Sequence, residues 1–328
     1  MRNRASYPNH GHNRSNVPIR IISVLVLVAW GAGLLASISP AVALPIAEAR
    51  LPINDWGIIH SDIVYDVVPA WDGEFFRLHD YIRRFQNSVA ALRLEIGMDR
   101  EAIAAALTEM VVASGLHNAY VAMVASLGVL LIPGTRDPRD CGNHFYAWCV
   151  PYVHVIKQEV LDAGASILIA ETVSRVPDAS INPRIKNYQW GDFTTGLFEA
   201  KEKGFETVVL ADQNGLITEG PGFNIFAIKD KRLITSSHGV LAGITRKTVF
   251  EIATELGLEI EVRDLPIAEL LSADEIFISS SGGGIMQITR VNKTIFSNGK
   301  TGPITQQMIN IYWSWFSKPE FTTAIDYS

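Results

Sequence analysis

The apolar residues of the chain follow strand-like spacing first and helix-like spacing next. Residues 51–78 form short apolar runs separated by turn residues, which predicts strands joined by turns at Asp55 and at Asp72–Gly73. A helix is predicted from about Asp80, because apolar residues then recur every three or four positions. A second helix is predicted between Asp99, a good N-cap, and Gly115, a good terminator. The apolar stripes of the two helices are Ile82, Phe85, Val89 and Leu92, and then Ile103, Leu107, Met110 and Val111.

Two long apolar runs follow, at residues 119–132 and 145–156, and they predict strands on either side of a polar loop at 133–144. Beyond them the chain is rich in short β runs, which are interrupted by two predicted helices. One helix is expected from about Trp190 to Gly204, and the other from Gly243 to Gly257. The pattern predicts an α+β protein, with a small α/β domain at 48–150 and a larger, barrel-like domain at 151–328.

The N-terminus, residues 1–47, has a different composition. Its first 20 residues carry four arginines and no acid, and residues 21–43 are uncharged and mostly apolar. A basic segment, an apolar run and the ending Ala41-Val42-Ala43 favour a secretory signal or a membrane anchor. The alternative is a strand pair at the start of the globular domain. Membrane contact is expected only from an uncleaved anchor, and the sequence leaves the cellular location open.

Composition excludes several classes of protein. The chain has 328 residues, a formal net charge of -6 and two cysteines, Cys141 and Cys149. The negative charge argues against nucleic-acid binding. Two cysteines suggest neither a zinc site nor a disulfide scaffold, so no metal is expected. Both are predicted to be reduced thiols, with Cys149 buried in a strand.

Lys186 lies among aromatic and amide residues in the stretch RIKNYQWGD, just before a predicted helix. One interpretation is an ordinary surface lysine, since lysine is rarely buried. The other is a partly desolvated amine with a lowered pKa, which can form a Schiff base. The residue alone leaves both interpretations open.

Three further motifs have a chemical and a plain interpretation each. Glu219, in TEGPGFNIF, is either a turn carboxylate or the partner of a protonated pyridine nitrogen. The segment 243–245 opens a helix, where backbone N–H groups favour a phosphate, although Thr245 could simply cap the helix. The segment SSSGGG at 279–284 can form an anion nest or a flexible turn.

The order and spacing of these motifs resemble those of the class IV aminotransferases, the fold-type IV pyridoxal 5'-phosphate enzymes. Within them the chain is most similar to (R)-selective amine transaminases and to branched-chain aminotransferase-like proteins. The resemblance covers about residue 44 to the C-terminus. It is carried by EARLPINDWGIIHSDIVYDV, FFRLHDYIRR, PRIKNYQWGD, TEGPGFNIF, GVLAGITRKTV, DEIFISSSGGGIM and TGPIT.

The resemblance implies a role for each matched residue. Lys186 would be the Schiff-base lysine, and Glu219 the partner of the pyridine nitrogen. The other cofactor contacts would be Arg84, Leu241, Ile244, Thr245, Ser281 and Gly282. The substrate pocket would include His60, Tyr65 and Trp190. Without the resemblance, Arg84 could be a solvated helix arginine, and the two aromatic residues His60 and Tyr65 could simply pack at a domain interface.

The chain departs from many relatives at Ala122, at Ser126 to Gly128 and at Pro133, where some relatives use an arginine for the substrate carboxylate. Arg136 and Arg139 lie in the same loop and could take over that role, although loop arginines are more often solvated. These departures affect the expected substrate and leave the expected cofactor chemistry unchanged.

The resemblance therefore implies a homodimeric transaminase. It would move an amino group from a hydrophobic amine or amino acid of one hand to a small keto acid such as pyruvate. One alternative is a lyase related to aminodeoxychorismate lyase, and a remote one is a non-catalytic protein that binds the cofactor. The natural donor, the acceptor and the stereopreference are not determined by the sequence.

Overall fold

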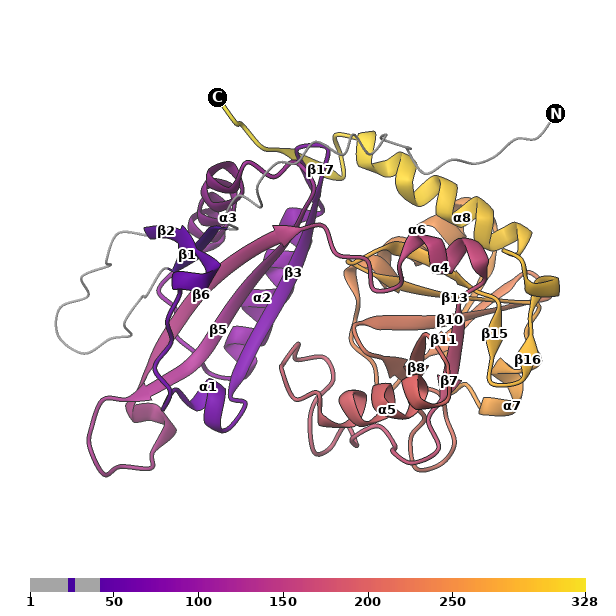
Figure 1. The fold of residues 1–328 in the computed structure, drawn as a ribbon, viewed down its shortest axis with the longest axis horizontal. Coiled ribbons are helices and arrows are strands. Elements are labelled where there is room, and N and C mark those ends of the chain that lie inside the picture. The colour runs from indigo at the N-terminus through magenta and orange to yellow at the C-terminus, as the bar shows by residue number, and fades with distance from the viewer. Residues whose placement is uncertain (1–22, 27–41) are drawn as a thin grey trace.

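The computed structural model describes residues 23–26 and 42–328, which form two bodies (Figure 1). The first body is a seven-stranded antiparallel sheet in the order β17-β4-β3-β5-β6-β1-β2. Its strands are β1 (Ser23–Val26), β2 (Val42–Pro45), β3 (Ile63–Trp71), β4 (Glu74–Phe76), β5 (Ala119–Leu130), β6 (Cys141–Pro151) and β17 (Thr322–Ala324). Helices α2 (Leu78–Ala91) and α3 (Arg100–Ser114) cover one face, and an apolar core fills the space between helices and sheet.

The second body contains two further sheets that share one apolar core. One has the order β12-β11-β10-β13-β14, with β9 paired to β10, and the other has the order β16-β15-β7-β8. Their strands are β7 (Ser166–Ile169), β8 (Thr207–Val209), β9 (Glu219–Gly220), β10 (Phe223–Lys229), β11 (Arg232–Ser236), β12 (Glu259–Arg263), β13 (Glu275–Ser280), β14 (Gly284–Ile288), β15 (Arg290–Val291) and β16 (Thr294–Ile295).

Helices cover both outer sides of the second body. Helix α5 (Gly191–Glu202) packs on β7 and β8, and α6 (Ile244–Glu255) and α8 (Pro303–Ser314) pack on the larger sheet. Shorter helices are α1 (Trp56–Ile59), α4 (Gln158–Ala163) and α7 (Ile267–Leu270). Two stacked sheets with helices outside agree with the predicted α+β protein, whose larger part is barrel-like.

Helix α3 follows its prediction closely. The Asp99 carboxylate accepts the Ala102 N–H at 2.8 Å, and Gly115 ends the helix with a φ of 66°. The prediction of a turn between strands at Asp55 is wrong. The Asp55 side chain caps α1 instead, accepting the Gly57 N–H at 2.7 Å. Strand β6 begins at Cys141, earlier than predicted, so the loop before it is shorter.

The cysteines agree with the prediction for the described residues. Cys149 is buried in β6, Cys141 is partly buried, and neither forms a disulfide.

The start of the chain contributes strands to the first sheet. Strand β1 pairs with β2 and with β6. These pairings agree with the strand-pair interpretation for residues 23–26 and 42–45, and the signal or anchor stays a prediction. The rest of the predicted signal or anchor, residues 1–22 and 27–41, lies outside the described residues. Within the described part of the chain, no helix is long and apolar enough to cross a membrane.

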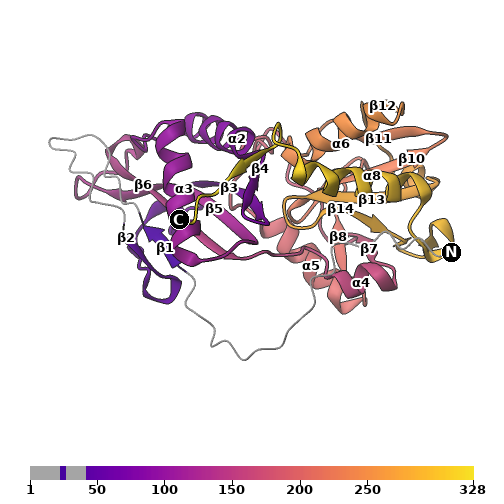
Figure 2. The ribbon, with the colours of Figure 1, turned by 90° about the horizontal axis from the view of Figure 1, so that it is seen from above.

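The C-terminal segment returns to the first body (Figure 2). Strand β17 pairs with β4, and the buried Ile325 joins the core of the first sheet. The segment therefore connects α8 of the second body to the edge of the first.

Candidate active site

A cavity lies where β3 and α2 of the first body meet the second body. The empty volume of the cavity, including its open mouth, is about 630 Å³. The cavity brings together nine of the residues that sequence reasoning selected. They are Tyr65, Arg84, Lys186, Trp190, Glu219, Leu241, Ile244, Thr245 and Ser281.

Lys186 is held by the edge of β3. The Tyr65 N–H donates to the Lys186 carbonyl at 3.0 Å, and Asn187 forms a bridge with Val64. The amine Nζ lies 4.4 Å from the centre of the Tyr65 ring. Burial, assisted by the nearby Arg84, lowers the pKa of the Lys186 amine from 10.5 to about 8. This buried environment agrees with the prediction of a desolvated amine with a lowered pKa.

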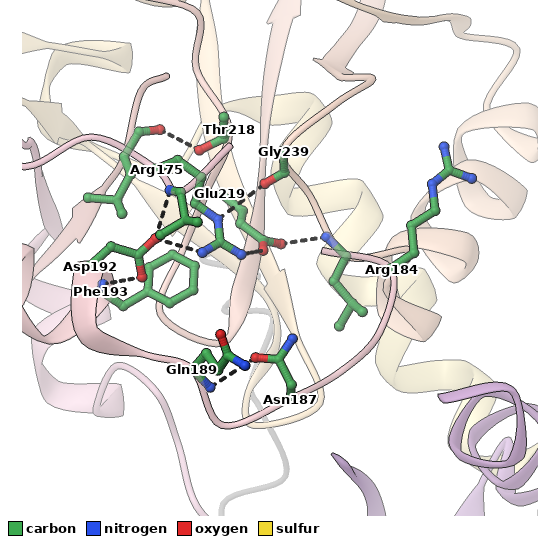
Figure 3. Close-up of polar contacts among 12 residues, drawn as sticks. Arg175, Arg184, Asn187, Gln189, Asp192, Phe193, Thr218, Glu219 and Gly239 are labelled. Atoms are coloured by element: carbon green, nitrogen blue, oxygen red, sulfur yellow. Dashed lines mark hydrogen bonds and ion pairs between the residues drawn. The ribbon is translucent and has the colours of Figure 1, made fainter. Parts of the chain in front are cut away.

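Glu219 is buried on the short strand β9 and is held through both carboxylate oxygens (Figure 3). Oε2 accepts the Leu241 N–H at 2.8 Å, and the Asn224 amide donates to it at 3.3 Å. The Arg175 guanidinium donates to Oε1 at 3.1 Å and to Asp192 at 2.7 Å. Burial raises the pKa of Glu219 to about 7, although Arg175 opposes the rise.

The opposite side of the cavity is built to accept an anion. Helix α6 begins there with Ile244 and Thr245, and its N-cap Gly243 offers no side-chain cap. The first N–H groups of a helix have no partner within the helix, and the helix dipole adds positive potential. Ser279 and Ser281 also line the cavity. We call Ile244, Thr245, Ser279 and Ser281 the anion end.

Two observations test whether this end fits a phosphate. The Ser279 hydroxyl is buried and has no hydrogen-bond partner among the described residues. Arg84 donates to Asp66 at 2.8 and 2.6 Å and to the Ala242 carbonyl at 3.1 Å, which leaves N–H groups of its guanidinium for a further acceptor. A donor-rich end, an amine and a buried carboxylate in one cavity fit a phosphorylated pyridine aldehyde.

Four of the predicted site residues do not line this cavity. His60 is exposed, lies against Trp56 and faces Asp62 at 3.6 Å. Arg136 and Arg139 belong to the β5–β6 loop, where Arg139 is exposed and pairs with Asp137 at 2.9 Å. Gly282 packs against the chain at Val153 instead.

Sequence reasoning missed Asp66, Arg175 and Asn224, which hold the predicted residues in place. Asp66 could have been noticed, because it is a lone acid within an apolar strand and is fully buried. Arg175 lies in an irregular segment after β7, and no local pattern distinguishes it from a solvated arginine.

Comparisons with known proteins agree with this arrangement. The family model described as amino-transferase class IV matches residues 63–291. D-alanine aminotransferase of Listeria innocua is 27% identical over 281 residues, covering 81% of this chain and 90% of its own. Branched-chain-amino-acid aminotransferase of Escherichia coli strain K12 is 23% identical over 279 residues, covering 82% and 89%.

A solved structure shares the fold. The branched-chain amino acid aminotransferase of T.th., crystallised with pyridoxamine 5'-phosphate, superposes with a TM-score of 0.81 at 23% identity. The match covers 94% of this chain and 100% of that one. The predicted fold, family and cofactor are confirmed. Because the family model matches more than half of the chain, the chain belongs to the class IV aminotransferases, and the protein is a pyridoxal-phosphate-dependent aminotransferase.

Proposed function

We propose that the protein transfers an amino group from a hydrophobic primary amine or amino acid to a small keto acid such as pyruvate, with Lys186 as the residue that binds the cofactor covalently. The observation that carries the proposal is the position of Lys186, which lies in one cavity with a buried carboxylate, an anion end and aromatic side chains. Pyridoxal phosphate supplies an aldehyde for the amine and an electron sink for the carbanion.

The environment of Lys186 supports its role as nucleophile and base. With a pKa of about 8, roughly a tenth of the amine is neutral at pH 7. An unperturbed lysine would be neutral in only about 0.03% of molecules. In the loaded enzyme the same Nζ would take up a proton from the substrate carbon and hold it for the later return step. Glu219 would face the ring nitrogen and favour its protonated form.

The charges of the cavity bear on the amino donor. Arg84 is paired with Asp66, and Arg175 is paired with Asp192 and Glu219. Tyr65 and Trp190 contribute aromatic walls near Lys186. Apolar walls and cations that are already paired favour a donor with a hydrophobic body, of the (R)-amine type or the branched-chain and D-amino acid type.

The keto acid still needs a cation for its carboxylate. We propose Arg136 and Arg139 for this role. Both belong to the β5–β6 loop and lie outside the cavity, so they can bind the carboxylate only after the loop moves or from a second subunit.

A homodimer is the second part of this proposal. Ile53, Ile58 and Ile59 around α1 are all more than half exposed, and Leu131 and Ile132 of the β5–β6 loop are exposed as well. Several large exposed apolar side chains at one end of a sheet are typical of an interaction surface. A second copy that covers this surface would bury them. Light scattering of a fully active monomer would contradict the dimer.

A half-reaction assay tests the proposal. Purified protein with bound pyridoxal phosphate is mixed with pairs of (R)- and (S)-amines and of D- and L-amino acids, and cofactor absorbance is followed. One hand of the hydrophobic donors should convert the cofactor, and Lys186→Ala should convert none. Borohydride reduction should label Lys186. Label on another lysine would contradict the proposal. Release of pyruvate from aminodeoxychorismate beyond one equivalent per active site, with no acceptor present, would contradict it in favour of a lyase.

The same assay, run with keto acids, tests the loop arginines. Arg136→Ala or Arg139→Ala should raise KM for pyruvate by about tenfold or more and leave the amine half-reaction nearly unchanged, since a charged hydrogen bond contributes about 1.5–3 kcal/mol. Wild-type pyruvate kinetics in both single variants and in the double variant would exclude the loop as the carboxylate site.

A further inference from the structure

The hydroxyl of Ser281, one of the donors at the anion end, is held by a second hydroxyl. Ser281 follows β13 and lines the cavity. Its Oγ lies 2.8 Å from the hydroxyl oxygen of Tyr81. Tyr81 is fully buried on α2 and does not itself line the cavity. It therefore contacts Ser281 of the anion end from the protein interior and not from the cavity.

The backbone of this turn is fixed independently of Tyr81. The Tyr152 hydroxyl donates to the Ser281 carbonyl at 2.9 Å and accepts the Gly283 N–H at 2.8 Å. The backbone contacts of Ser281 do not fix its χ1 torsion. A serine can occupy three staggered rotamers, whereas the branched side chain of threonine is restricted at the same torsion. The position of the Ser281 hydroxyl therefore depends on its hydrogen bond.

Tyr81 is suited to hold that hydroxyl as a donor. Burial raises the pKa of the Tyr81 phenol, so its proton stays in place near neutral pH. A hydroxyl has one hydrogen to donate and two lone pairs to accept with. If Tyr81 donates to the Ser281 oxygen, the Ser281 hydrogen remains available to a ligand in the cavity. Tyr81 also precedes Arg84 by three residues, so α2 presents both side chains on one face.

We propose that Tyr81 is a positioning residue for the phosphate of the cofactor, because its hydroxyl holds Ser281 Oγ in the rotamer that directs the Ser281 hydrogen into the anion end. This inference rests on the proposed function, which assigns the phosphate to that end. Tyr81 does not line the cavity. Its hydroxyl also interacts with the Thr245 side chain, and the inference concerns its contact with Ser281.

The test compares two ligands that differ only in the phosphate. Cofactor-free wild type and Tyr81→Phe are titrated with pyridoxal 5'-phosphate and with pyridoxal, and binding is followed by absorbance. Both ligands carry the aldehyde that reacts with a lysine. Tyr81→Phe should lower the affinity for pyridoxal phosphate by about tenfold, which is the effect of one charge-assisted hydrogen bond. Its affinity for pyridoxal should stay within about twofold of the wild-type value. Tyr327→Phe, which removes a hydroxyl bonded to the distant Leu116 carbonyl, serves as the control and should bind both ligands like wild type.

Rescue separates positioning from packing. Adding Ser281→Thr to Tyr81→Phe should recover most of the lost affinity, because the branched side chain restricts the torsion that Tyr81 had held. Ser281→Thr alone should change affinity little. Ser281→Ala should weaken the binding of pyridoxal phosphate and spare that of pyridoxal. Adding Tyr81→Phe to Ser281→Ala should cause no further loss, because the effect of Tyr81 is transmitted by the Ser281 hydroxyl.

Three results would overturn the inference. They are an unchanged affinity for pyridoxal phosphate in Tyr81→Phe, an equal loss for both ligands, and no recovery in the double variant. Failure of the wild type to bind pyridoxal phosphate would instead overturn the proposed function. The two failures are therefore distinguishable.

Discussion

The carboxylate of Glu219 is bonded to Arg175, which is bonded in turn to Asp192 (Figure 3). Arg175 also lies over the Phe193 ring, 4.3 Å from its centre, and is only about 10% exposed. A cation fixed in this way opposes the effect of burial on Glu219. The protonation of Glu219 near pH 7 therefore depends on a residue that no local sequence pattern identified.

Replacing Arg175 by methionine should raise the pKa of Glu219 above 7, because the cation that stabilises the carboxylate is lost. Only the ionised form pairs with a protonated ring nitrogen, so pyridoxal phosphate should bind more weakly as the pH falls through the pKa of Glu219. The midpoint of that fall should move up by about one pH unit, which corresponds to about 1.4 kcal/mol. Binding titrations between about pH 5 and 9 measure it.

Arg175→Lys is the matched control, because it keeps the positive charge near Glu219 and should shift the midpoint less than the methionine variant. Superimposable pH profiles for wild type and Arg175→Met would show that Arg175 does not influence the carboxylate.

At the scale of the element, the start of α6 is shaped by Gly243. A Cβ at this position would overlap the side-chain oxygen of Asn224. The Asn224 amide donates to the Leu241 carbonyl at 3.1 Å and to Glu219 at 3.3 Å. One small residue therefore lets the helix N-terminus approach Asn224 of β10, whose amide also bonds to Glu219.

Gly243→Ala should displace Asn224 and shift the first turn of α6, which weakens binding of pyridoxal phosphate by about tenfold or more. Gly191→Ala is the matched control. It also lies at the start of a helix near the cavity, and an added Cβ there meets nothing within 4 Å. Equal affinities for the two variants, measured by the same absorbance titration, would contradict the role of the close approach.

The elements that could be predicted from sequence are those with strong local signals. Helix α3 has a capping aspartate, an apolar stripe and a terminal glycine, and both of its ends were predicted within a residue. Helix α8 was missed, although Pro303 opens it, and α1 has only four residues. The residues of the cavity could be selected together only because the family resemblance assigned sequence segments far from Lys186 and Glu219 to the same site. The Arg175 and Asp66 contacts join segments far apart in the chain, and spacing alone does not reveal them.

At the scale of the whole molecule, the cavity needs contributions from both bodies. Helix α2 of the first body carries Arg84, and α6 of the second carries Ile244 and Thr245. Arg77, the residue before α2, joins the two helices. It pairs with Asp80 at 3.0 Å and with Glu251 of α6, and Lys247 of α6 also pairs with Asp80 at 2.9 Å.

The C-terminal segment completes this junction. The Arg77 guanidinium lies 4.8 Å from the centre of the Phe321 ring and 5.9 Å from that of Trp315. The Arg77 N–H donates to the Phe321 carbonyl at 2.7 Å. With only 4% of its side chain exposed, Arg77 is shielded from water, so its ion pairs are screened less than surface pairs.

Arg77→Met should therefore lower the free energy of unfolding by about 2 kcal/mol, since it removes charge-assisted hydrogen bonds while keeping much of the apolar packing. Because the same contacts set the distance between α2 and α6, affinity for pyridoxal phosphate should fall together with stability. Arg83→Met is the matched control. Arg83 also pairs with Asp80 but is 54% exposed, and exposed pairs contribute about 0–1 kcal/mol. Urea unfolding and cofactor titration of both variants decide the point. If Arg77→Met lost stability but bound the cofactor like wild type, the junction would hold the two bodies together without shaping the cavity between them.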